Sequence, residues 1–230
     1  MACCYLVRTQ NGVVLIDAGM STDAEYLLSI CETSFGPDAR ITAILLTHWH
    51  NDHSAGTADV AFRTAAPVYF NEIEYPYFSG VTKRGGAGSA IADRIPEIGP
   101  FVLLKGLLGN SVPRPVEPTG FVRDGEEVLG EFLVIETPGH TGGHTSYFHR
   151  PTGALFTGDA LAVVGKKLRL MSSFVTPDKS RALESAIRCL DRDVTLICPG
   201  HRYPLTEGVG HERSRFLELL STRDSWPLFG

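Results

Sequence analysis

The sequence has no long apolar run and no excess of positive charge. No stretch approaches the roughly 20 uninterrupted apolar residues of a membrane-spanning helix, and the first residues lack the basic and apolar regions of a signal peptide. We therefore expect a soluble, cytoplasmic protein with no membrane partner. The 21 Lys and Arg residues face 26 Asp and Glu residues, which gives a formal net charge of -5 at pH 7. This charge repels a polyphosphate backbone, so we expect no nucleic-acid partner.

Cysteine is scarce and shows no paired spacing. An odd count without an export signal favours reduced thiols, and free cysteine is usually buried. We therefore predict reduced, mostly buried cysteines. The five cysteines, none in CxxC or zinc-finger spacing, are Cys3, Cys4, Cys31, Cys189 and Cys198.

The composition supports one compact domain over residues 1–230. Hydrophobic residues make up 43% and charged residues 20% of the 230 residues, a balance that supports a real core. Residues 71–120 differ in character, because they contain a Gly-rich stretch at 85–88 and end in a Pro-rich stretch at 113–118. We interpret residues 71–120 as a lid or insertion over one face of the domain.

Local patterns predict strands and helices in both halves of the chain. Asn11 and Gly12 lie between two β-prone runs and predict a hairpin that ends near Asp17. Thr22 begins a capping-box pattern for a helix through about residue 34. The other predicted elements are a strand at 41–46, a strand at 67–70, β alternation at 121–134 with a turn at 124–125, a hairpin at 146–156, a helix with Thr176 as N-cap and Pro177 at its first position, a strand at 194–198 and a helix at 210–222.

Three imidazoles and a carboxylate follow the strand predicted at 41–46, within six residues. So many polar groups need more partners than the end of one apolar strand supplies, unless a cation binds them. His48 and His50 alternate and can project to one side of an extended turn, whereas Asp52 and His53 turn toward another. The motif therefore offers nitrogen and oxygen ligands for two neighbouring metal sites.

Three further candidate ligands lie where apolar, β-like runs end in turns. They are His140 in PGHT, Asp159 in TGD and His201 in PGH. Because loops at the ends of packed strands meet at one edge of a sheet, we expect these side chains to lie near the first cluster. Together with that cluster, they indicate a metal centre.

The set THWHNDH, PGHTGGH, FTGDA and CPGH resembles the metallo-β-lactamase superfamily in its dinuclear hydrolase branch, which includes glyoxalase II and N-acyl homoserine lactonases. LIDAG, with Asp17, is similar to a further motif of that family. The resemblance spans roughly residues 5–204 and implies an α/β fold, a four-layer αββα sandwich with the site at one edge of its two sheets. Family members usually have one or more strands before this start, so we expect a missing edge strand or a start upstream.

The resemblance also implies a ligand set. His48, His50 and His140 would hold one divalent metal ion, and Asp52, His53 and His201 a second. Asp159 would bridge the two ions, and Asp17 would orient the ligands without binding metal. Mixed imidazole and carboxylate ligands favour zinc, although iron and manganese tolerate the same set.

The activity implied is hydrolysis of an ester, thioester, lactone or related bond in a small-molecule substrate by a metal-bridging hydroxide. Asp52 and Asp159 are the expected catalytic carboxylates. Glutathione thioesters are disfavoured, since glyoxalase II has a C-terminal helical domain for which the residues after His201 leave too little chain. One alternative is a persulfide dioxygenase with a single iron on His48, His140 and Asp159, although its Gly-Arg-Thr-Asp-Phe signature is missing from residues 160–174. A phosphodiesterase of the same fold is a further alternative.

Candidates for substrate contact flank the predicted site or lid. An aromatic lining with one or two basic groups would suit a small acyl or lactone substrate with an anionic or apolar tail. For each residue alone, core packing or simple exposure is favoured over contact. The candidates are Trp49, Phe70, Tyr75, Tyr77, Lys83, Arg84, Met171, Phe174 and Tyr203.

Overall fold

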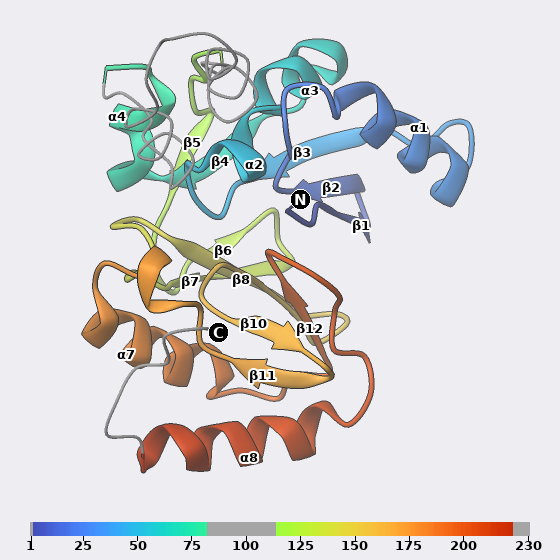
Figure 1. The fold of residues 1–230 in the computed structure, drawn as a ribbon. Helices are drawn as coiled ribbons and strands as arrows, with labels where there is room; N and C mark the ends of the chain where they lie inside the picture. The colour runs from blue at the N-terminus through green and yellow to red at the C-terminus, as the bar shows by residue number, and fades with distance from the viewer. Residues whose placement is uncertain (1, 82–113, 223–230) are drawn as a thin grey trace, which may run out of the picture.

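The computed structural model describes residues 2–81 and 114–222, and in these ranges the chain forms two face-to-face sheets with helices on both outer sides (Figure 1). The strands make two five-stranded sheets and one two-stranded ribbon. This arrangement is the αββα sandwich predicted from the sequence. No helix in the described ranges is both long and apolar enough to cross a membrane.

The first sheet contains the N-terminal strands in the order β1-β2-β3-β4-β5. The predicted hairpin is confirmed, with β1 and β2 antiparallel and Gly12 at a φ of 126°, a conformation that a side chain would disfavour. The remaining neighbours pair in parallel. The strands are β1 (Tyr5–Thr9), β2 (Gly12–Ile16), β3 (Ile41–Leu45), β4 (Val68–Asn71) and β5 (Gly120–Val122).

The second sheet has the order β12-β9-β8-β7-β6, in which only β12 and β9 pair in parallel. The predicted hairpin at 146–156 is confirmed. A turn does form at 124–125, but it joins β5 of the first sheet to β6 of the second. Alternation of polar and apolar residues cannot reveal which sheet a strand joins. The strands are β6 (Glu127–Val128), β7 (Phe132–Glu136), β8 (Thr145–His149), β9 (Ala154–Gly158) and β12 (Leu196–Pro199), and the ribbon is β10 (Ala162–Val164) with β11 (Lys167–Arg169).

The predicted helices are present, but two of their start signals were wrong. Thr22 makes no capping bond to α1, because Asp23 is its N-cap residue and accepts from the Met20 N–H instead. Asp178 caps the later helix by accepting from the Arg181 N–H. The helices are α1 (Ala24–Phe35), α2 (Asn51–Ser54), α3 (Thr57–Thr64), η1 (Glu72–Glu74), α4 (Tyr75–Phe78), η2 (Ser173–Val175), α7 (Lys179–Leu190) and α8 (Val209–Ser221).

The cap of α7 therefore lies two residues after the predicted Thr176. The Thr176 hydroxyl donates to the Ser172 carbonyl, so it is not available to cap the helix. Pro177 precedes the N-cap rather than occupying the first helical position.

Three apolar clusters separate the four layers. Within β2, Val13 and Leu15 pack with α1 and α3, whereas Val14 and Ile16 pack between the two sheets. A strand buried on both faces explains why this segment is an uninterrupted apolar run. The third cluster joins the second sheet to α7 and α8. Burial of a side chain such as Leu15 contributes about 1.5–3 kcal/mol, so these clusters fix the strand ends that carry the site.

The predicted lid at 71–120 falls largely on residues 82–113, which lie outside the described residues, as do Lys83 and Arg84. It stays a prediction. The cysteines agree with expectation: all five are free, and Cys31, Cys189 and Cys198 are buried.

Candidate metal centre

Every side chain predicted to bind metal lies at one edge of the sandwich. The first sheet contributes the loop after β3 and the short helix α2, which carry the HxHxDH motif. The second sheet contributes the turns after β7, β9 and β12. The ligand atoms that these turns bring together fall into three overlapping groups, each within 4.8 Å: His48, His50 and His140; His48, His53 and Asp159; Asp52, His53 and His201.

The first group consists of three imidazoles. His50 Nδ1 lies 3.0 Å from His48 Nε2 and 2.9 Å from His140 Nε2. Burial lowers the pKa of all three rings, helped by the positive charge that the neighbouring rings would carry, and the pKa of His50 falls to about 3. These rings are therefore neutral at pH 7, the form in which histidine binds a metal ion.

The third group, Asp52, His53 and His201, combines two imidazoles with a carboxylate. His53 Nε2 lies 3.4 Å from His201 Nε2 and 3.9 Å from Asp52 Oδ2, which is 3.5 Å from His201 Nε2. The Asp52 side chain is 39% exposed, whereas the His53 side chain is completely buried. Asp52 is therefore the carboxylate of this group that reaches solvent.

Asp159 lies between the first group and the third group. Its Oδ2 is 3.2 Å from His140 Nε2 and 3.4 Å from His201 Nε2, and its Oδ1 is 3.5 Å from His53 Nε2. Burial alone would raise the pKa of Asp159, but the three surrounding imidazoles hold it below its ordinary value, so the group is a carboxylate.

The free oxygen of Asp159 tests whether these residues fit a cation. Oδ1 is buried and accepts no hydrogen bond from the described residues. A buried carboxylate oxygen without a donor is costly, and a bound cation removes that cost. The donor set of imidazole nitrogens and carboxylate oxygens is also one that divalent metal ions accept, so the residues present fit a metal pair.

Hydrogen bonds behind the imidazoles fix their orientation. Asp17 Oδ2 accepts from His53 Nδ1 at 2.8 Å, and the Asp17 carboxylate also accepts from the Thr47 amide and hydroxyl. The Thr47 hydroxyl oxygen in turn contacts His48 Nδ1 at 3.0 Å. With Nδ1 engaged in this way, Nε2 of both rings points toward the centre. Asp17 thus contacts the cluster from behind.

The charges around His53 are unusual for a buried ring. Burial would lower the pKa of His53, but Asp159 and Asp17 raise it to about 9.

The His140 ring is also held from behind. Its Nδ1 donates to the Val175 carbonyl at 2.5 Å, which turns His140 Nε2 toward Asp159.

Two buried residues support the site in ways that the sequence did not reveal. Glu74 accepts from the backbone N–H groups of Trp49 at 2.9 Å and Gly143 at 2.7 Å, so it joins the HxHxDH loop to the loop after β7. His144 accepts from the Asp159 N–H through Nε2 at 3.0 Å. Glu74 offered no local signal, because it lies within the predicted lid and belongs to none of the ligand motifs.

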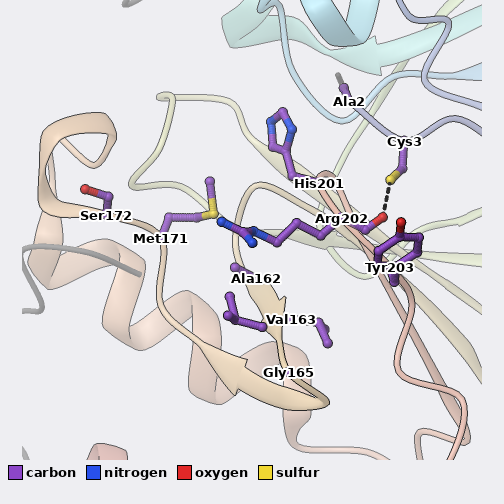
Figure 2. A pocket seen from close by; sticks show the side chains of 11 residues that line it. Ala2, Cys3, Ala162, Val163, Gly165, Met171, Ser172, His201, Arg202 and Tyr203 are labelled. Atoms are coloured by element: carbon purple, nitrogen blue, oxygen red, sulfur yellow. Dashed lines mark hydrogen bonds between the residues drawn. The ribbon is translucent and has the colours of Figure 1, made fainter.

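The candidates for substrate contact occupy several environments. Trp49 is buried and stacks on Tyr77 at 4.5 Å, and Phe70 lies in the core against α4. Met171 and Tyr203 line a pocket beside His201, as Figure 2 shows.

Comparisons with known proteins agree with this geometry. The family model described as Metallo-beta-lactamase superfamily matches residues 2–201. A probable metallo-hydrolase of Bacillus subtilis, YflN, is 28% identical over 85% of this chain and 77% of its own. A hydroxyacylglutathione hydrolase of Yersinia pestis is 30% identical over 87% of this chain, which spans 61% of that protein.

Solved structures share the fold. TTHA1623, crystallised in a di-iron-bound form, is 27% identical with a TM-score of 0.68 and covers 94% of this chain and 96% of its own. The B3 metallo-beta-lactamase BLEG-1 is 22% identical with a TM-score of 0.65 over 94% of each chain, which shows the fold alone.

Proposed function

The chain belongs to the metallo-β-lactamase superfamily, and from that premise we propose that this metallo-hydrolase cleaves an ester, thioester, lactone or related acyl bond of a small molecule. Two divalent metal ions are part of the proposal. The observation that carries it is the set of three overlapping histidine and aspartate clusters around the unpartnered Asp159 Oδ1. The proposed ligands are His48, His50 and His140 for one ion, Asp52, His53 and His201 for the other, and Asp159 for both.

A bound pair of divalent cations would supply an acidified water as nucleophile and would polarise the scissile carbonyl. The chain's own residues perform the remaining tasks. Asp159, buried and anionic, holds the two ligand groups at a fixed separation. Asp52 is exposed enough to take the proton of the attacking water and return it to the departing oxygen or sulfur. Asp17 and Thr47 keep the ring nitrogens of His53 and His48 pointed at the centre.

The names of two relatives support this proposal. Hydroxyacylglutathione hydrolase acts on an acyl thioester by its name, and YflN is a probable metallo-hydrolase. For the metal, we propose zinc, because imidazole and carboxylate ligands suit it, with iron as the second choice since TTHA1623 holds two irons.

Elemental analysis of the purified protein, together with turnover of thioesters, lactones and phosphodiesters, tests the proposal. We expect about two metal ions per chain and hydrolysis of at least one acyl substrate, lost with a chelator and restored by metal. Asp159→Ala should lose at least one ion and nearly all turnover while the protein stays folded. Asp38→Asn, which removes an exposed carboxylate, is the matched control. One iron per chain with oxygen consumption, or normal metal content in Asp159→Ala, would refute the proposal.

A further inference from the structure

A pocket of about 910 Å³ opens beside His201 (Figure 2). Ala2 and Cys3 form one wall, and the β10 residues Ala162 and Val163 form another. The volume lies within the usual range of small-ligand sites, which is about 300–1,000 Å³. Because His201 belongs to the candidate metal centre, a molecule in this pocket reaches the proposed metals with one end.

The backbone of Arg202 is held in a specific, strained conformation at this pocket. Its φ is 71°, in the left-handed region that non-glycine residues rarely adopt. Cys3 Sγ donates to the Arg202 carbonyl at 3.0 Å, and Val163 of β10 forms a β-bridge with Arg202. Such strain persists only where the surroundings enforce it, and it often marks functional sites. These contacts on both sides of the backbone fix the direction in which the Arg202 side chain leaves the chain.

The Arg202 side chain extends across the pocket. In Figure 2 it passes below His201 and above Ala162 and Val163, and its guanidinium group ends beside Met171. The pocket thus combines apolar side chains with one permanently charged group. This combination fits a ligand with an apolar body and one negative charge.

No carboxylate neutralises Arg202 within the ranges 2–81 and 114–222, where its guanidinium takes part in no ion pair or hydrogen bond. Other arginines differ: Arg188 pairs with Asp124 at 2.9 Å, and Arg215 pairs with Glu212 at 2.6 Å. Among the residues that line the pocket, Arg202 alone carries a permanent charge. In a chain of net charge -5, this exposed cation is a local site for an anion.

We propose that Arg202 binds a free carboxylate on the acyl substrate, so that the enzyme prefers esters, thioesters or lactones that carry a second, anionic carboxyl group. This proposal rests on the proposed hydrolase function. The guanidinium fork matches a carboxylate with two parallel hydrogen bonds. Ala162, Val163 and Met171 contact the carbon chain, and the scissile bond lies toward His201. One charged fork suits a monoanion, whereas a phosphate dianion normally needs several donors.

A pair of probes tests this assignment by binding as well as by turnover. Calorimetry on the purified full-length protein measures the affinity for 4-phenylbutanoate and for 4-phenylbutanamide, which lacks the charge. In parallel, kcat/KM is measured for the phenyl thioester of glutaric acid and for the same compound with its free carboxyl methylated. We expect Arg202→Gln to weaken carboxylate binding by about tenfold or more and to reduce the preference for the charged thioester by a similar factor.

Arg202→Gln leaves the demand on the left-handed backbone unchanged, so any change in binding reports on the loss of the guanidinium group. Arg202→Lys should retain part of the preference, because the charge remains without the fork. Arg63→Gln removes an equal charge from the exposed end of α3 and should change neither measurement. Equal carboxylate affinity in wild type and Arg202→Gln overturns the inference. Carboxylate binding that depends on Arg202, without turnover of any acyl compound, refutes the hydrolase proposal instead.

Discussion

Replacing Glu74 by Ala tests whether one buried carboxylate holds together the two loops that carry the candidate ligands. The Glu74 side chain is 1% exposed and accepts from the Trp49 and Gly143 amides. Burial raises the pKa of Glu74, and these two N–H groups offset part of the rise. Alanine leaves both N–H groups buried without an acceptor.

The magnitude follows from the two lost hydrogen bonds. A buried donor left unsatisfied costs about 1–3 kcal/mol, so two of them predict a loss of about 3 kcal/mol in unfolding free energy. For a chain of this length, that loss lowers the melting temperature by roughly 6–12 °C. Loosening both loops should also weaken metal binding by about 10–100-fold, as loss of a supporting partner usually does.

Two measurements check the Glu74 prediction: thermal unfolding with and without metal, and metal affinity by competition with a chelator. Glu72→Ala is the matched control, because Glu72 is exposed on the same short helix. Glu74→Gln should fall between wild type and alanine, since its amide oxygen still accepts from one of the two N–H groups. If Glu74→Ala keeps both stability and metal affinity, the two hydrogen bonds do not hold the loops and our reasoning is wrong.

Three further substitutions test other contacts. Asp17→Asn, which suits the left-handed backbone at φ 56°, should lower metal affinity about 10–100-fold in the chelator assay, and an unchanged affinity would contradict its supporting role. Gly139→Ala places a Cβ within 2.6 Å of the Ala182 backbone. This clash should lower the unfolding free energy by about 2 kcal/mol or more. Gly210→Ala is the control, because the space around Gly210 is open and the substitution should not destabilise the protein. Arg215, which pairs with Glu212, lowers the pKa of that carboxyl below 4.5. The unfolding free energy of the wild type should therefore exceed that of Glu212→Gln above pH 4.5, and this difference should shrink as the pH falls further. A difference that stays constant with pH would refute the pairing.

The sequence was sufficient to predict that these His and Asp side chains lie together, because each lies where an apolar run ends in a turn. His48 and His50 also share a local motif, which needs no knowledge of the tertiary structure. The turn at 124–125 was predicted in the right place, yet its crossing between the sheets depends on which strands pair, a long-range property. In the same way, Thr176 and Asp178 are both good N-cap residues, and contacts with Ser172 decided between them.

Glu74 and Arg202 show the other limit of sequence reasoning. The role of Glu74 comes from two amides that are 25 and 69 residues away along the chain. The role we infer for Arg202 depends on a left-handed backbone that Cys3 and Val163 enforce from distant segments. Such roles arise from tertiary packing alone, so no spacing rule could have found them.

The candidate ligands come from both halves of the sandwich. His48 and His50 belong to the first sheet, and His140, Asp159 and His201 to the second. An ion held by both sets, as we propose, would link the two layers and would stabilise the folded protein through mass action. Each tenfold rise in free metal above the dissociation constant adds about 1.4 kcal/mol to the folded state. Metal supply would thus govern how long the protein survives in a cell, independently of catalysis.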